Sequence, residues 1–294
     1  MRQSITVLAP AKINLGLSVF PRREDGYHDI QSIFTTVNLC DRIFVERWPE
    51  KDVCLVDCKG MDLPKENTFT KAYKAFCVLT GIRDGVHVTV EKHIPAGGGL
   101  GGGSSDSSSF IQSIDILFGT QLDSSAWNYI SSQVGSDVFF FSAALQLQRE
   151  KELLNGRVFS AVVEGRGERI YPIESRTDLW VLLVFPGVFV STAEAYALVD
   201  ANMKSCSRSI QKDRLVDSYN GPVREWFFSN DFATPVVGRY PKIQQALNSL
   251  KGCGADFVDM SGSGSTVFCI FEKEDNAVSA YEAVARQWCS VLVH

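Results

Sequence analysis

The chain lacks several features that would place it in common protein classes. No apolar run in its 294 residues reaches about eighteen, the length of a membrane-spanning helix. Its start lacks the apolar block of a secretory signal peptide, so we expect a cytoplasmic protein. The net charge of −5 argues against nucleic-acid binding through bulk positive charge. We therefore expect neither a nucleic-acid nor a membrane partner, and we infer no obligate protein partner.

Cysteine is present but never in the spacing that binds metal. The eight cysteines form no C-x-x-C pair, and the closest two, Cys54 and Cys58, have no histidine nearby. A disulfide framework is not expected in a chain of this size without a secretion signal. We therefore expect free thiols and no metal ligated by the protein.

Glycine is concentrated in one stretch, residues 94–108, which reads IPAGGGLGGGSSDSS. Upstream, valines alternate with polar residues over 86–91 and predict a half-buried strand. Downstream, apolar residues at helical spacing over 110–118 predict a helix, with Ser104, Ser105 or Asp106 as its N-cap. Backbone N–H groups at a helix N-terminus bind anions, most often phosphate. The order strand, glycine loop, helix therefore predicts a phosphate site.

Two other interpretations of the glycine loop stay open. Gly97, Gly99 and Gly102 match the dinucleotide pattern G-x-G-x-x-G, although almost any pattern matches a run this rich in glycine. A flexible linker has a similar composition, but linkers rarely join a periodic strand to a periodic helix. A Walker P-loop is excluded because no lysine follows the glycines.

The first seventy residues contain two groups of candidate functional side chains. Residues 5–20 alternate as a strand would, which places Lys12 and Asn14 on the face away from the core. A lysine in that position is most often merely solvated. After a charged turn, Tyr27 and His28 either stack on and hydrogen-bond a planar base or simply anchor the loop.

Further elements are predicted up to residue 157. We expect a helix over 67–79 that Gly81 ends, and another that Asp123 caps and Gly135 ends. Asp137 precedes an apolar run that we interpret as a strand. Composition favours a turn-forming role for this aspartate over a carboxylate held at the edge of a cavity. Residues 146–157 are charged and resemble a surface hairpin or excursion.

The second part of the chain has a recognisable order of elements. Strands are expected over 180–185, 256–260, 266–271 and 291–293. Helices are expected from Ser191 or Thr192 to Val199 and over 241–250 and 275–288, with a polar loop over 202–220. The order β-α-α-β-β-α-β is typical of a split βαβ, ferredoxin-like layer. We place a domain boundary near residue 175, which gives domains 1–175 and 176–294.

Three stretches together resemble the GHMP small-molecule kinases: PAKINL at 10–15, the glycine–serine loop, and SGSG at 261–264. Within that superfamily, DGYH at 25–28 and GSDVFFF at 135–141 are similar to segments of the 4-diphosphocytidyl-2-C-methyl-D-erythritol kinase family. The resemblance implies an α+β, two-domain GHMP kinase fold. Its N-terminal ribosomal-S5-domain-2-like α/β domain and C-terminal ferredoxin-like domain would flank the active site in a cleft.

The resemblance also implies an activity and its residues. The reaction would be ATP-dependent phosphorylation of the 2-hydroxyl of 4-diphosphocytidyl-2-C-methyl-D-erythritol, in the non-mevalonate isoprenoid pathway, with Mg²⁺ accompanying ATP. Lys12 and Asp137 would be catalytic. The expected substrate-binding residues are Asn14, Tyr27, His28, Phe185 and Thr192. The expected ATP-binding residues are Pro95, Ala96, Gly97, Gly98, Gly99, Leu100, Gly101, Gly102, Gly103, Ser104 and Ser105. By position in the family, Asn67 and Lys92 are candidates for contacting adenine.

The chain departs from the family in two places, and other functions remain alternatives. Asp106 stands where the family usually has asparagine, and a carboxylate near phosphates is unfavourable unless it faces a cation. The segment 143–166 is longer than usual. Another GHMP kinase, acting on mevalonate, phosphomevalonate, homoserine or a sugar, is the alternative enzyme. A non-catalytic nucleotide-binding protein and a dinucleotide oxidoreductase are further alternatives.

Overall fold

The computed structural model describes residues 3–150, 158–202 and 209–294, in two compact units. Unit 1 comprises residues 1–11, 39–94 and 101–157, and unit 2 comprises residues 12–38, 95–100 and 158–294. Strands β1 (Ser4–Arg22) and β2 (His28–Trp48) contribute residues to both units. The boundary near residue 175 stays a prediction.

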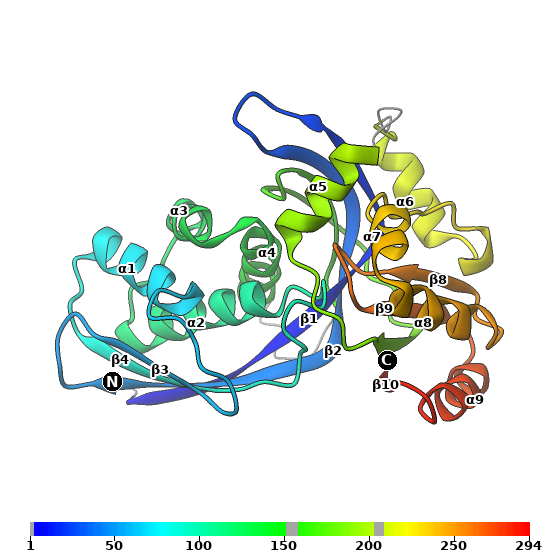
Figure 1. Ribbon diagram of the computed structural model, residues 1–294. Helices are drawn as coiled ribbons and strands as arrows, with labels where there is room; N and C mark the ends of the chain where they lie inside the picture. Colours follow the sequence, from blue (N-terminus) through cyan, green and yellow to red (C-terminus); the bar gives the residue numbers. More distant parts are fainter. Residues whose placement is uncertain (1–2, 151–157, 203–208) are drawn as a thin grey trace. The chain divides into compact units, whose positions relative to one another are not determined.

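Unit 1 is a sheet with helices on one side. The second half of β2 pairs antiparallel with β4 (Gly85–Glu91), which pairs parallel with β3 (Cys54–Cys58). Valines of β4 are buried while the residues between them are half-exposed, which confirms the strand predicted over 86–91. The helices that lie on one side of these strands (Figure 1) are α1 (Thr68–Thr80), α2 (Gly102–Phe118), α3 (Ser124–Val134) and α4 (Ser136–Glu150).

Local capping explains where two of these helices begin and end. The Asn67 side chain accepts hydrogen bonds from the backbone N–H of Phe69 (3.0 Å) and Thr70 (3.1 Å) ahead of α1. Asp123 accepts from the Ala126 N–H at 2.8 Å ahead of α3. Such caps satisfy N–H groups that lack partners within the helix. The predicted helices over 67–79 and 123–135 are confirmed.

Three predictions about unit 1 are wrong. The run after Asp137 forms helix α4 instead of a strand, and residues 146–150 belong to that helix instead of a hairpin. Val138, Phe140, Phe141 and Ala144 are buried. Short apolar runs cannot be assigned to helix or strand by periodicity alone. Here the run forms a helix in which these four apolar side chains are buried. The rest of the expected hairpin, 151–157, lies outside the described residues. Helix α2 begins at Gly102 with Gly101 as its N-cap, so the expected serine or aspartate cap is also wrong.

Unit 2 contains an antiparallel sheet in the order β10-β7-β9-β8. Its strands are β7 (Trp180–Phe185), β8 (Phe257–Met260), β9 (Val267–Phe271) and β10 (Cys289–Val293). Helices α8 (Pro241–Lys251) and α9 (Glu274–Val284) pack on it. This strand order confirms the ferredoxin-like layer. The first half of β2 pairs with β5 (Ser160–Gly165), which pairs with β6 (Arg169–Ile173), so the chain has the predicted α+β fold with two sheets.

The rest of unit 2 is helical. Its remaining elements are α5 (Thr192–Asn202), α6 (Lys212–Asn220), the short 3₁₀ helix η1 (Val223–Glu225) and α7 (Ala233–Arg239). The loop predicted over 202–220 is wrong over α6, where Leu215 and Tyr219 are buried four residues apart on one helical face. Residues 203–208 of that loop lie outside the described residues. Within the described ranges, no helix is both long and apolar enough to cross a bilayer.

Candidate functional site

Lys12 and Asn14 are buried side by side on β1. Their neighbours Ile13 and Leu15 point to the opposite face, as the alternation predicted. Lys12 is 3% exposed, and its Nζ donates a hydrogen bond to Asn14 Oδ1. The ammonium also lies 4.8 Å from the centre of the Phe34 ring. A lysine so deeply buried is not the solvated side chain that its sequence position favours, so this observation supports a functional role.

The backbone carbonyls of the glycine loop accept hydrogen bonds from two other segments of unit 2. Lys12 N–H donates to Leu100 O at 3.0 Å, Ser261 Oγ donates to Gly99 O at 2.9 Å, and Thr266 N–H donates to Gly98 O at 3.1 Å. These contacts bring together the three stretches that resemble GHMP kinases. The carbonyls of residues 98–100 are therefore held by the protein, which fixes the course of this loop.

Glycine is required in the loop for steric reasons. Gly99 has φ near +75°, and a Cβ atom there would lie 2.0 Å from the Ser261 carbonyl oxygen. Any side chain at this position would collide with the Ser261 backbone, and the positive φ would strain the backbone of residue 99 itself. The close approach between residue 99 and the 261–265 turn therefore depends on glycine.

Asn230 positions the 261–265 turn, and sequence reasoning missed it. Its Nδ2 donates to Met260 O at 2.7 Å and to Gly262 O at 2.8 Å. A Cβ atom on Gly262 would lie 3.3 Å from Lys12 Nζ, so this turn also approaches the buried lysine. No local pattern identifies Asn230, since its partners lie thirty residues along the chain.

Helix α2 follows the glycine loop and has no side-chain cap. Its N-cap Gly101 has φ near +70°, and the N–H groups of Ser104 and Ser105 donate to the Gly101 carbonyl. An uncapped helix N-terminus directs N–H groups and a partial positive charge outward, which suits phosphate oxygens. Ser105 Oγ is buried and has no hydrogen-bond partner among the described residues.

Asp106 faces a cation, which answers the concern about a carboxylate here. Lys92 Nζ lies 2.7 Å from Asp106 Oδ2 and also hydrogen-bonds Asp41. Burial raises the pKa of Asp106 to about 7, against the opposing effect of Lys92. Burial alone would lower the pKa of Lys92, but the two carboxylates outweigh it and raise that pKa. We call Asp41, Lys92 and Asp106 the Lys92 cluster.

The residues expected to contact adenine and to act as the base lie in unit 1. Asn67 uses its side chain to cap α1, and Lys92 forms ion pairs with Asp41 and Asp106. Asp137 is half-buried in the first turn of α4. Its convergence with Lys12, which belongs to unit 2, stays a prediction, as do the adenine contacts.

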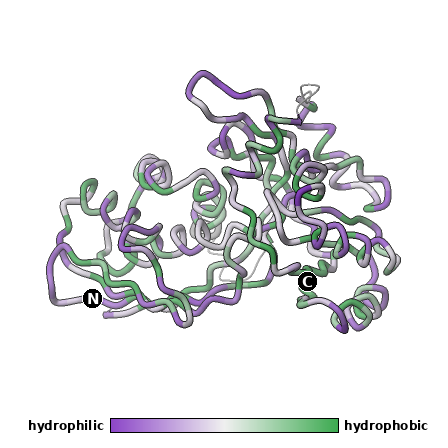
Figure 2. The backbone as a smooth tube through the Cα atoms, viewed as in Figure 1, coloured by the Kyte–Doolittle hydropathy of each residue, from purple (hydrophilic) through white to green (hydrophobic). Residues whose placement is uncertain are grey.

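The two aromatic candidates for base recognition lie in different environments. Tyr27 is 54% exposed, with the Arg166 guanidinium 4.7 Å from its ring centre. His28 is buried, and its Nδ1 lies 2.8 Å from the Phe20 carbonyl oxygen. The connection between β1 and β2, which ends at Tyr27 just before His28, is hydrophilic, as Figure 2 shows. Tyr27 is therefore accessible to a ligand, whereas His28 is held in place by the protein.

Tyr196 of α5 is an aromatic neighbour that sequence reasoning missed. It stacks on His28 with ring centres 5.0 Å apart and an angle of 21°. Asp200, one helical turn further, places a carboxylate oxygen 3.4 Å from His28 Nε2. Tyr196 thus adds a third aromatic ring to the two predicted base-recognition residues, and Asp200 adds a carboxylate.

The remaining substrate candidates lie at the two ends of the connection between β7 and α5. Phe185 is the half-buried last residue of β7, opposite Cys289 in the sheet register. Thr192 is exposed and is the first residue of α5. Ser191 caps this helix, since its Oγ accepts from the Glu194 N–H at 3.1 Å. Contact of Phe185 and Thr192 with a substrate stays a prediction.

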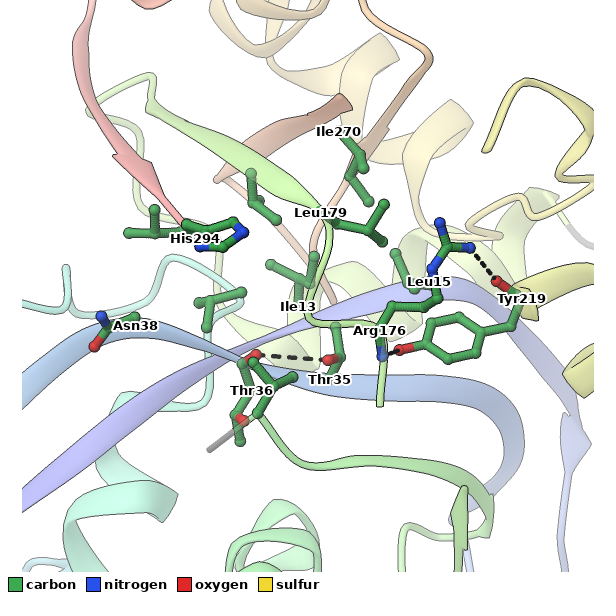
Figure 3. A pocket seen from close by; sticks show the side chains of 14 residues that line it. Ile13, Leu15, Thr35, Thr36, Asn38, Arg176, Leu179, Tyr219, Ile270 and His294 are labelled. Carbon is green, nitrogen blue, oxygen red and sulfur yellow. Dashed lines mark hydrogen bonds between the residues drawn. The ribbon is translucent and has the colours of Figure 1, made fainter. Parts of the chain in front are cut away.

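A small pocket in unit 2 is separate from these residues. Ile13 and Leu15 line it, so it lies on the opposite face of β1 from Lys12 and Asn14 (Figure 3). Its cavity volume is about 30 Å³, enough for about one water molecule and too small for a nucleotide. In the part of the chain that the structure describes, no group of three histidine, cysteine or acidic side chains is arranged to hold a metal.

Comparisons with known proteins point to one family. The model of the GHMP kinases N terminal domain matches residues 67–144, and that of the GHMP kinases C terminal domain matches residues 223–290. A curated protein of Treponema pallidum (strain Nichols), named 4-diphosphocytidyl-2-C-methyl-D-erythritol kinase, is 37% identical, with 98% of this chain and 97% of the relative aligned. A protein of the same name from Geobacter sulfurreducens is 33% identical, with 99% of each aligned.

A solved structure agrees with these relatives. The crystal structure of a 4-(cytidine 5'-diphospho)-2C-methyl-D-erythritol kinase superposes with a TM-score of 0.78 at 28% identity. The alignment covers 98% of both chains. The likeness therefore extends over both units.

Proposed function

Because the chain belongs to the 4-diphosphocytidyl-2-C-methyl-D-erythritol kinases of the GHMP kinase family, we propose that it phosphorylates the 2-hydroxyl of that alcohol with ATP. The hydroxyl oxygen forms a bond to the γ-phosphorus while the bond from that phosphorus to the β–γ bridging oxygen breaks. The products are ADP and the 2-phosphate of the cytidylyl alcohol. This reaction belongs to the non-mevalonate route to isoprenoids.

The observation that carries the proposal is the meeting of three segments in unit 2. Residues 98–100 of the glycine loop offer their carbonyls to Lys12, Ser261 and Thr266. This anchoring supports a phosphate cradle formed by residues 95–105, in which backbone N–H groups bind the phosphates of ATP. A flexible linker would not be held at three consecutive residues.

Lys12 and Asp137 are the proposed catalytic residues. Asp137 accepts the proton of the 2-hydroxyl as the oxygen attacks the γ-phosphorus. Lys12 stabilises the negative charge that spreads over the transferring phosphoryl group. Asn14 accepts a hydrogen bond from Lys12 and so fixes the direction of the ammonium.

Substrate recognition is proposed for the aromatic residues near the β1–β2 connection and α5. The exposed ring of Tyr27 stacks on the cytosine, and His28 completes the recognition of the base. Tyr196, which stacks on His28, adds a third ring to this site. Phe185, Thr192 and Asn14 complete the proposed contacts to the sugar-alcohol part.

Mg²⁺ is proposed to accompany ATP, held mainly by phosphate oxygens and water. Ser105 Oγ fits as a protein ligand because it is buried without a hydrogen-bond partner among the described residues. When bound, the ion neutralises charge on the phosphates. A cytoplasmic location stays a prediction.

A coupled ADP-release assay tests the proposal. Purified protein is supplied with ATP and a panel of alcohols: the cytidylyl alcohol, the same alcohol without the cytidylyl group, mevalonate and homoserine. We expect turnover of the first compound only. Release of ADP with mevalonate or homoserine alone would point to another GHMP kinase, and no turnover with any alcohol would point to a non-catalytic nucleotide-binding protein.

The Asp137→Asn variant tests the proposed base. Loss of a general base typically lowers kcat by about 10²–10⁴-fold. We expect a loss in this range with little change in nucleotide affinity, because Asp137 acts on the hydroxyl proton. Affinity is measured by calorimetric titration of a non-hydrolysable ATP analogue. A variant with the wild-type kcat would remove Asp137 from the mechanism.

A further inference from the structure

The exposed side chain of Phe189 lies on the glycine loop. Phe189 is 69% exposed, in the connection between β7 and α5. A Cβ atom built on Gly97 would lie 2.4 Å from Cε2 and 2.5 Å from Cδ2 of the ring, so the ring directly contacts the Gly97 backbone. An aromatic ring that remains mostly in water gains little from burial. Its position therefore indicates a role other than core packing.

The same connection is tied to the 261–265 turn. Ser265 Oγ donates a hydrogen bond to the Val188 carbonyl, and the next residue, Thr266, donates its N–H to Gly98 O at 3.1 Å. Residues 188 and 189 therefore contact both the glycine loop and the segment that anchors it. All these contacts lie within unit 2.

The other end of the connection leads into the proposed acceptor site. Two residues separate Phe189 from Thr192, and the first of them, Val190, is buried. Ser191 caps α5, and Tyr196 on that helix stacks on His28. A displacement of the start of α5 is therefore passed on to Phe189 through a short segment, which is held at Val188 by Ser265 and at Ser191 by the cap of α5.

We propose that Phe189 is a positioning residue that couples binding of the acceptor alcohol at α5 to the conformation of the ATP-binding glycine loop. The inference rests on the proposed function, because the acceptor must bind near His28 and Tyr196. With the ring against Gly97, an acceptor that orders the start of α5 also orders the loop. Each substrate then binds more tightly in the presence of the other, by the same factor in both directions.

Calorimetric titration of a non-hydrolysable ATP analogue, with and without the cytidylyl alcohol, measures this coupling. We expect the alcohol to tighten analogue binding to the wild type by about fivefold or more. In Phe189→Ala this ratio should fall to near one, while Phe189→Leu, which keeps an apolar side chain on Gly97, should retain most of it. Phe227→Ala is the matched control, because Phe227 is also an exposed phenylalanine of unit 2 and packs instead near Arg214. A wild-type ratio near one, or an unchanged ratio in Phe189→Ala, would overturn the proposal.

A double-mutant cycle tests the contact itself, independently of the acceptor. Gly97→Ala brings a Cβ atom into the Phe189 ring and also strains a residue with φ near +66°. Removing the ring relieves only the collision, so the loss of analogue affinity caused by Gly97→Ala should be smaller in the Phe189→Ala background. Equal losses in both backgrounds would refute the contact. Failure of the proposed function would appear separately, as a wild type that releases no ADP with the cytidylyl alcohol.

Discussion

At Lys92, one ammonium group forms ion pairs with two buried carboxylates, Asp41 and Asp106. Asp41 accepts hydrogen bonds from the N–H groups of His93 (2.6 Å) and Ile94 (2.8 Å), the residues that lead into the glycine run. Asp106 sits in the helix that follows the same run. The Lys92 cluster therefore connects, within unit 1, the chain just before the glycines with the helix just after them.

Removing the cation of this cluster should lower the free energy of unfolding more than removing one of its carboxylates. Lys92→Met leaves Asp41 and Asp106 buried without their cation, which should lower the free energy of unfolding by about 3–5 kcal/mol. Asp106→Asn keeps the Lys92–Asp41 pair and should cost about 1 kcal/mol or less, because it removes the carboxylate that burial disfavours. Urea unfolding at pH 7.5 measures both values. Equal costs for the two variants would contradict this account of the cluster.

Residue positions were predictable where they follow from alternation along one strand. Lys12 and Asn14 were placed on the same face of β1 from their spacing alone. Their burial was not predictable, because it depends on residues far away in the chain, such as Phe34 and Gly262. Tyr196, Asn230 and Phe189 were missed for the same reason. Each acts through a contact for which the local sequence has no pattern.

Among the elements, those with their own caps were predictable. Helices α1 and α3 each begin at an asparagine or aspartate cap and end at glycine, so their bounds follow from local chemistry. The sequence predicts a strand at the start of helix α4 because that start is a run of bulky apolar residues, which suits either structure. The sequence does not predict helix α6, because most of its residues are polar and only two, Leu215 and Tyr219, are buried.

The outer face of the unit 1 sheet carries a histidine that spans three strands. His87 on β4 lies 3.0 Å from Glu46 on β2 and 2.8 Å from Asp57 on β3. Burial lowers the pKa of His87, but the hydrogen bonds and charges of the two carboxylates outweigh that effect and raise it above its usual value. Protonated His87 therefore holds the three strands together more strongly than the neutral form.

This arrangement predicts the sign of a pH effect on stability. Because the folded protein binds the proton more tightly than the unfolded chain, the stabilisation is complete below about pH 6.5, the ordinary pKa of histidine. It is lost as the pH rises through the raised pKa of the folded state. The difference in unfolding free energy between wild type and His87→Gln should thus shrink from pH 6 to pH 9 in urea titrations. A constant difference over that range would show that the ion pairs do not contribute.

At the scale of the whole molecule, the two units share their long strands. β1 and β2 enter both units, and the glycine run begins in unit 2 and ends in unit 1. Residues 12–38 are integral to unit 2: Leu17 N–H donates to Ser229 O at 2.8 Å, and Asp231 N–H donates to Leu17 O at 2.9 Å. Ile13 and Leu15 line the same small pocket as Val181 of β7 and Ile270 of β9 (Figure 3).

This sharing predicts how the chain unfolds and tests the predicted boundary near residue 175. A fragment of residues 176–294 lacks β1 and β2, so the side chains that face Ile13 and Leu15 would be exposed to water. Burial of each such large apolar side chain contributes about 1.5–3 kcal/mol, a large part of the 5–15 kcal/mol that stabilises a typical domain. We therefore expect the fragment to be unfolded by circular dichroism, and the full chain to unfold in urea in a single transition by circular dichroism and tryptophan fluorescence. A folded fragment, or two separate transitions, would instead establish residues 176–294 as an autonomous domain.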